Sequence, residues 1–154
     1  MNIIVIVGVL CCMIFSILYI KILKPHKENI NLLNRQLKAC KDTLYAYIYS
    51  SDTCCKFCCD FYDDRLKCEK CLWLKFYEKK DYACFTWLNK EMFKINKKST
   101  NWETFFKLKF SEQEDYKLLR EKRISMLRDW ISELEKEKYK LMYKFEKTIF
   151  NIYK

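Results

Sequence analysis

Glycine, proline and histidine are nearly absent from this chain, which holds one residue of each type. Tight hairpin turns depend on glycine and on Asn-Gly pairs, so their shortage disfavours a β-sandwich or barrel and favours a mainly α-helical protein. A single glycine and a single histidine also exclude glycine-rich phosphate loops, H-E-x-x-H zinc motifs and the G-x-S-x-G nucleophile turn. We therefore predict that the protein is not an enzyme.

Charge is missing from the first part of the chain. Residues 3–20 carry no charged side chain, and such a run is long enough to cross a bilayer as a helix. A cleaved signal peptide would begin with basic residues and end in a small-residue cleavage site, and neither feature is present. The sequence predicts a retained N-terminal transmembrane anchor over residues 1–24.

The basic residues around this run predict its orientation. Lys21, Lys24 and Lys27 follow it, whereas no lysine or arginine precedes it. By the positive-inside rule, the C-terminal body of this single-pass protein is expected in the cytoplasm. The net charge of +10 makes the membrane, through its anionic leaflet, the first expected partner.

An amphipathic stem helix is predicted over residues 25–50. Pro25 is expected to break or kink the helix after the anchor. From residue 28, apolar side chains recur at spacings of three and four, as in a heptad-like helical stripe: Ile30, Leu33, Leu37, Cys40, Leu44 and Tyr47.

Residues 51–98 form a cysteine-rich region that is also aromatic and basic. Two C-x-x-C pairs predict a zinc site made by Cys55, Cys58, Cys68 and Cys71, in which four thiolates would hold the metal. Disulfides compete with zinc, because the eight cysteines outside the anchor form an even set: Cys40, Cys54, Cys55, Cys58, Cys59, Cys68, Cys71 and Cys84. A third interpretation treats some of them as small buried apolar groups. The sequence leaves all three open.

The aromatic residues between 73 and 110 are interleaved with lysines. Such a pattern can bind single-stranded nucleic acid. A small domain with few aliphatic residues in this region needs its rings in the core, so we predict buried aromatics with solvated lysines. Nucleic acid is not an expected partner.

The C-terminal region, residues 99–154, is predicted to contain a long helix from about residue 112. Two S/T-x-x-E capping boxes, at Thr100 and Ser111, predict helix starts. Apolar residues at heptad spacing form a predicted interaction face, either packed within the chain or used for homo-oligomerisation or a protein partner: Ile124, Leu127, Ile131, Leu134, Leu141, Phe145 and Ile152.

Together these patterns predict a membrane-anchored structural or protein-interaction module. The sequence is rich in residues with A/T-rich codons, namely Lys, Asn, Ile, Phe and Tyr. This composition fits a viral envelope component or a viral entry component. The first alternative is a zinc-stabilised cytoplasmic adaptor at a membrane. The more distant alternative is a thiol-disulfide oxidoreductase, because C-x-x-C is also the disulfide-exchange motif.

Overall fold

The computed structural model describes residues 3–49, 71–78, 83–101, 104, 108 and 110–152. Of these residues 89% are helical and none lies in a strand. The mainly α-helical fold and the long apolar N-terminal helix are therefore confirmed. The other boundaries proposed from the sequence, those of the cysteine-rich region above all, fall partly or wholly outside the described residues.

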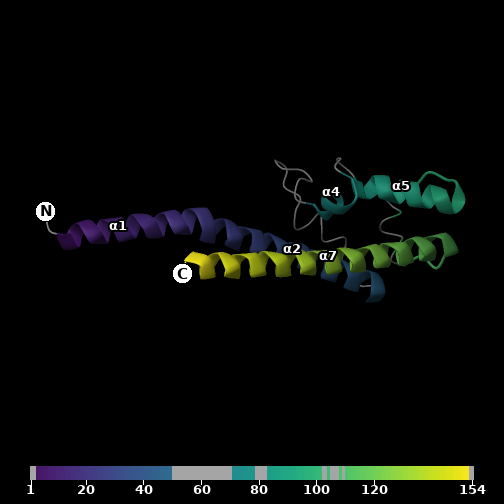
Figure 1. Cartoon of the computed structure of the whole chain (residues 1–154). Helices are drawn as coiled ribbons and strands as arrows, with labels where there is room; N and C mark the ends of the chain where they lie inside the picture. The colour runs from purple at the N-terminus through teal and green to yellow at the C-terminus, as the bar shows by residue number, and fades with distance from the viewer. Residues whose placement is uncertain are drawn as a thin grey trace. The chain divides into compact units, whose positions relative to one another are not determined.

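The N-terminal helical stretch runs without interruption from Ile3 to Tyr49. It comprises α1 (Ile3–Leu18), a five-residue π-helical segment η1 (Tyr19–Leu23) and α2 (Lys24–Tyr49) (Figure 1). The amide of Lys24 donates a hydrogen bond to the carbonyl of Tyr19, five residues earlier, as is typical of a π-helix.

Of the break or kink expected at Pro25, a break does not occur, because the helix continues through this residue. In an α-helix the proline ring would collide with the carbonyl of Lys21, four residues earlier, and would leave it without an amide donor. The wider π-helical segment lies directly before Pro25. The helix therefore continues past the proline with a local π-turn inside an otherwise α-helical stretch.

The remaining described helices are α4 (Leu72–Phe76), α5 (Ala83–Asn96) and α7 (Glu114–Ile152). The last of these begins close to the start predicted from the sequence. The capping box at Ser111 differs in detail, because its hydroxyl accepts a hydrogen bond from the amide of Gln113 at 3.2 Å. The carbonyl of Gln113 then accepts from the amides of Tyr116 and Lys117, which opens the helix. The short helix predicted near residue 101 falls mostly outside the described residues.

The chain divides into two compact units. Unit 1 contains residues 1–34 and 136–154, and unit 2 contains residues 35–135. In unit 1 the first turns of α2 lie beside the last turns of α7, which run in the opposite direction (Figure 1). The rings of His26 and Phe145 stack between them, with centroids 3.8 Å apart.

Unit 2 contains the fully buried core. The side chains of α5 and of the first half of α7 approach each other as an antiparallel pair, shown by the Asn96–Asp115 hydrogen bond at 2.9 Å and the Lys122–Glu91 ion pair at 2.7 Å. Leucines contributed by α4, α5, α7 and the intervening segment have no exposed surface: Leu72, Leu88, Leu108, Leu119, Leu127 and Leu134. Each such side chain contributes about 1.5–3 kcal/mol through burial.

The turn after α5 shows how a chain with almost no glycine ends a helix. Lys97 adopts a positive φ of 61°, the conformation usually taken by glycine at this position. The amide side chains of two asparagines hold the following residues, because Asn96 accepts from the amide of Lys98 and Asn89 accepts from the amide of Thr100. Residues 97–99 form a loop between α5 and the following segment.

Candidate functional site

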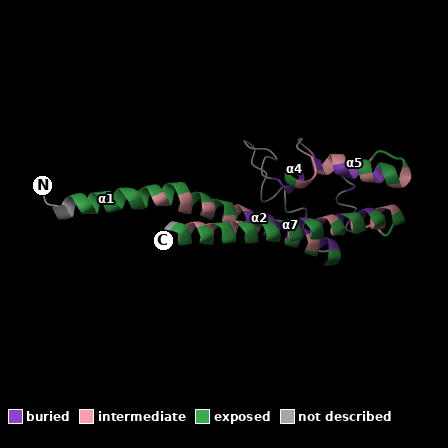
Figure 2. Cartoon of the chain, viewed as in Figure 1, coloured by how far each residue is buried: buried purple, intermediate pink, exposed green. Residues whose placement is uncertain are grey.

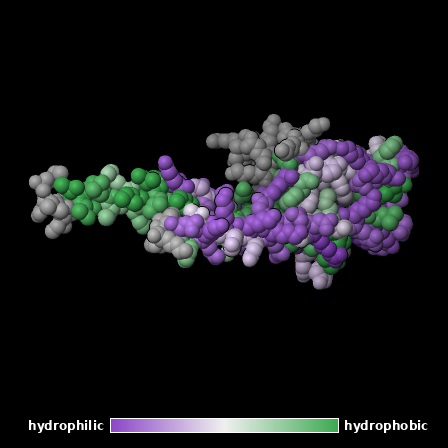
Figure 3. Space-filling view, in the orientation of Figure 1, coloured by the Kyte–Doolittle hydropathy of each residue, from purple (hydrophilic) through white to green (hydrophobic). Residues whose placement is uncertain are grey.

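The membrane-type segment in unit 1 exposes its apolar side chains. From Ile6 to Ile17 every residue of α1 is exposed (Figure 2). By length and composition, the helical stretch that starts at Ile6 is able to cross a membrane, and none of its most apolar window is buried within the chain. The hydrophobic surface gives way to hydrophilic surface at the end of this segment (Figure 3).

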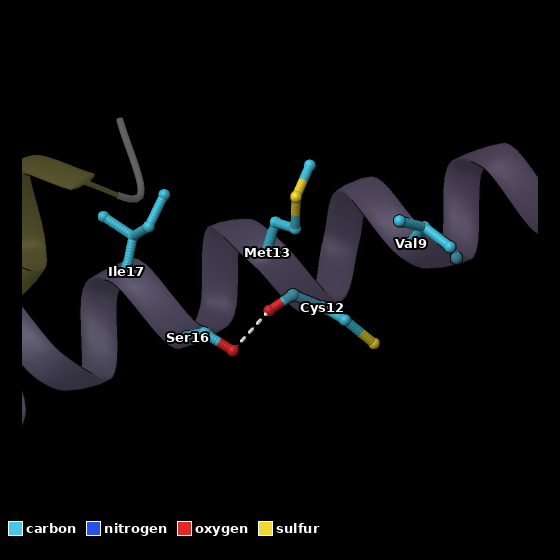
Figure 4. A pocket seen from close by; sticks show the side chains of 6 residues that line it. Val9, Cys12, Met13, Ser16 and Ile17 are labelled. Carbon is cyan, nitrogen blue, oxygen red and sulfur yellow. Dashed lines mark hydrogen bonds between the residues drawn. The ribbon is translucent and has the colours of Figure 1, made fainter.

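A shallow groove runs along this exposed helix. It is lined by Gly8, Val9, Cys12, Met13, Ser16 and Ile17 (Figure 4). The hydroxyl of Ser16 donates to the carbonyl of Cys12 at 2.8 Å, so the one hydroxyl of the groove is satisfied within the helix. Gly8 has no neighbouring atom within 4 Å of the place where a Cβ would stand. Gly8, Cys12 and Ser16 have small side chains at a spacing of four residues, so no bulky group fills the groove on this side of the helix.

Next to this segment, the two helices of unit 1 share a half-buried seam. On the N-terminal side the seam consists of Leu18, Ile22, Leu23, His26 and Ile30. On α7 it consists of Lys138, Leu141, Phe145, Thr148 and Ile149. Burial is partial at every one of these positions, so the seam is a single layer of side chains between two helices.

The centre of unit 2 holds an arginine among aromatic rings. Arg123 has no exposed surface, and its guanidinium carbon lies 4.2 Å from the ring centroid of Trp73. The same carbon lies 5.3 Å from the ring of Trp130 and 5.9 Å from that of Trp87. These distances are within the range of cation–π attraction, which is strongest for tryptophan and for desolvated cations.

Three helices position this arginine–tryptophan cluster (Arg123, Trp73, Trp87 and Trp130). Trp73 comes from α4, Trp87 from α5, and the other two from α7. The ring of Trp73 meets that of Trp130 edge to face, with centroids 5.1 Å apart, and lies tilted against that of Trp87, with centroids 5.4 Å apart. Edge-to-face contacts add stability beyond burial alone. The cluster therefore joins the three helices at one point.

Sequence reasoning missed this cluster. The predicted heptad began at Ile124, but the buried stripe of α7 starts earlier and includes a charged residue: Leu119, Arg123, Leu127, Trp130 and Leu134. The available signal was the spacing of 119, 123, 127, 130 and 134, which keeps Arg123 in register with leucines. Arginine is rarely fully buried, so this spacing alone does not predict a buried Arg123.

Ion pairs surround the cluster on α5 and α7. Burial alone would raise the pKa of the Glu91 carboxyl, but hydrogen bonds from Lys122 and Lys94 outweigh it and bring the pKa below its ordinary value. The hydrogen bond from Lys90 to Glu78 raises the pKa of Lys90. Lys41 of α2 contacts Glu135 of α7 at 2.8 Å, also within unit 2. Such exposed pairs contribute little each.

Only some cysteines of the predicted zinc and disulfide sites are among the described residues. Cys54, Cys55, Cys58, Cys59 and Cys68 lie outside the described residues. Cys40 and Cys71 are buried and Cys84 is half-buried, and no disulfide joins two of the cysteines in the described ranges. Among those same ranges, no group of three or more potential ligands could hold a metal ion. Zinc and disulfides both remain predictions.

The predicted interaction face of α7 lies largely against the chain itself. Leu127 and Leu134 are fully buried in unit 2, while Leu141 and Phe145 are half-buried in unit 1. Ile124 and Ile131 are half-buried in unit 2, and the side chain of Ile152 is not among those described. Large apolar side chains that remain exposed on the body therefore lie elsewhere.

Several of the predicted core aromatics are exposed. Trp73 and Trp87 are buried as expected, but Phe93 and Phe110 are about half exposed, at 54% and 52%. At the end of α2, Tyr45, Ile48 and Tyr49 are also exposed, and the two tyrosine rings contact each other at 4.5 Å. The expectation that the rings of the 73–110 region lie in the core thus holds for Trp73 and Trp87 and not for these phenylalanines.

Comparison with protein-family models, curated proteins and solved structures found no match to this chain. The functional argument therefore depends on the residues and contacts described above.

Proposed function

We propose that the protein is a single-pass membrane-anchored, non-enzymatic interaction module, with α1 as its retained anchor and a helical body in the cytoplasm. The observation that carries the proposal is that every residue from Ile6 to Ile17 is exposed, so this apolar stretch has no buried face. So large an apolar surface is unfavourable in water and favourable in a bilayer.

The continuity of the helix supports this role. Because η1 carries the chain past Pro25 without a break, the anchor and α2 form one helical stretch. Lys21, Lys24 and Lys27 lie where the apolar surface ends, as expected for the cytoplasmic side of an anchor. A flexible linker would loosen the body from the membrane, whereas a helix limits its freedom of movement there.

The exposed apolar residues of unit 2 are the candidate contacts for a protein partner. They occur at the end of α2 (Tyr45, Ile48 and Tyr49) and around the α5–α7 connection (Phe93, Phe110 and Leu118). Tyrosine and phenylalanine are enriched at protein interfaces, because each buries a large area with few rotatable bonds. A cytoplasmic membrane-anchored body can present such residues to a partner or to a second copy.

The anchor is tested by alkaline carbonate extraction of membranes from cells that produce the full chain. The wild type is expected in the pellet, and the double variant Val9→Arg/Phe15→Arg in the supernatant. Arginine near the centre of a span costs roughly 2.5–3.5 kcal/mol per residue. The matched control is Leu118→Arg/Phe110→Arg, which places the same charges on exposed apolar positions of unit 2 and should remain in the pellet.

Two further measurements separate a retained anchor from a cleaved signal peptide and determine the orientation. The intact mass of the extracted protein is expected to include residues 3–20. A C-terminal epitope is expected to be digested by protease added to the cytoplasmic side of sealed vesicles. A shortened mass would refute the retained anchor, and a protected epitope would refute the cytoplasmic body.

A further inference from the structure

The end of α7 returns to the level of the predicted membrane boundary. Phe145 stacks on His26, which lies three residues after the end of η1. From this contact, α7 continues toward the anchor, and its last turn reaches the level of Ile17 (Figures 1 and 4). Leu18 and Ile22 are half-buried whereas the α1 residues just before them are exposed, which agrees with this coverage.

Lysines from two distant parts of the sequence therefore share one level of unit 1. Lys21 lies in η1, and Lys24 and Lys27 lie in the first turn of α2. Lys144 and Lys147 lie in the last turns of α7. All five are exposed. We call this group the lysine collar.

The charge at this level is predominantly positive. Residues 21–28 and 144–151 hold five lysines and two glutamates, Glu28 and Glu146, which gives a net charge of +3 when His26 is neutral. Positive charge next to a membrane span attracts anionic headgroups, because the negative surface potential is strong only within a Debye length of the bilayer.

Aromatic side chains accompany the collar. Phe150 is exposed on the last turn of α7, and Tyr19 is exposed at the start of η1. Rings at the boundary between lipid and water are typical of membrane-interface belts. Phe150 has 61% of its surface accessible, and for an exposed ring lipid is a more favourable environment than water.

We propose that α2 and the end of α7 together form a binding surface for anionic phospholipid headgroups, with Phe150 inserted at the interface. The inference rests on the proposed membrane anchor and adds a lipid preference and a second contact point. Charge complementarity and continuity with the anchor single out lipid as the occupant. The sequence alone shows only the three lysines of the N-terminal side, because more than one hundred residues separate the two groups.

The test uses the full chain with a benzophenone amino acid at position 150, reconstituted into vesicles of phosphatidylcholine with about one-fifth phosphatidylserine. After irradiation, mass spectrometry identifies the lipid adducts. We expect phosphatidylserine adducts to exceed their bulk share about two- to five-fold at low salt. The variant Lys144→Gln/Lys147→Gln should reduce this enrichment, and high salt should reduce it further.

The matched control is Lys97→Gln/Lys98→Gln, which removes two exposed lysines from the turn after α5 and should leave the enrichment unchanged. Carbonate extraction of the same samples reports the anchor separately. If the chain stays in the membrane but adducts show bulk composition, or if position 150 links only to a second protein copy, the collar is wrong and the anchor stands. Release of the chain by carbonate would overturn both proposals.

Discussion

The two halves of α7 belong to different units and are stabilised in different ways. From Glu114 to residue 135 the helix places leucines, Trp130 and Arg123 in a core with little or no exposed surface. From residue 136 to 151 none of its side chains is fully buried, and one half-buried row contacts the start of α2. A single helix can thus be a core element in one unit and a surface element in another, and its composition changes accordingly from leucine-rich to lysine-rich.

The largest expected effect comes from truncating a core leucine in the first half. Leu127→Ala should lower the free energy of unfolding by about 3–4 kcal/mol, because the lost methyl groups leave a cavity in a fully buried position. Leu141→Ala, at the half-buried row, should cost about 1 kcal/mol. Chemical denaturation in detergent, followed by tryptophan fluorescence, measures both, and equal effects would contradict the difference between the halves.

Arg123→Lys is expected to cost about 2 kcal/mol. Lysine keeps the charge but lacks the planar guanidinium that lies over Trp73, so the cation–π contact is lost in a desolvated site. The same denaturation experiment measures this effect, and Arg128→Lys, an exposed position one helical turn further on, should change stability by less than about 0.5 kcal/mol. An unaltered Arg123→Lys variant would show that the planar contact contributes nothing.

In the second half, Phe145→Ala should affect local structure more than global stability. Loss of the stack on His26 should free the last turns of α7, with a cost of about 1 kcal/mol. Hydrogen exchange of the amides between 141 and 151 should quicken, whereas the amides of α5 keep their protection. Exchange that quickens equally in both helices would mean that the two units unfold together.

The smallest expected effect concerns pH. The pKa of Glu91 is lower in the folded protein than its ordinary value of about 4.5, so its ion pairs stabilise the fold above that pH. This contribution is lost as the pH falls through the folded-state pKa. Glu91→Gln should cost about 0.5–1 kcal/mol at pH 7 and almost nothing in strong acid. Glu121→Gln, at an exposed position, serves as the control, and a constant Glu91→Gln effect across this range would refute the assignment.

Local patterns predicted most of the helices, because their signal lies within a few turns. The charge-free run and the stripe from Ile30 to Tyr47 both coincide with helix. Pro25 misled the prediction, since the local rule against proline does not include a compensating π-turn. The burial of Arg123 could not be predicted locally, because it depends on tryptophans from three helices. The contact between Phe145 and His26 joins distant parts of the sequence, so no local sequence pattern indicates it.

The π-helical segment η1 also determines how the side chains of α2 are rotated around the helix axis relative to those of α1. An i→i−5 turn contains one residue more than an α-turn, which shifts every later side chain by about 100° around the axis. The side of α2 that meets α7 therefore does not continue the same side of α1. Deleting a single residue from Tyr19–Leu23 would remove the extra residue of the π-segment and leave the seam facing Phe145, whereas forcing all five residues into α-helical turns would rotate the seam by about 100°.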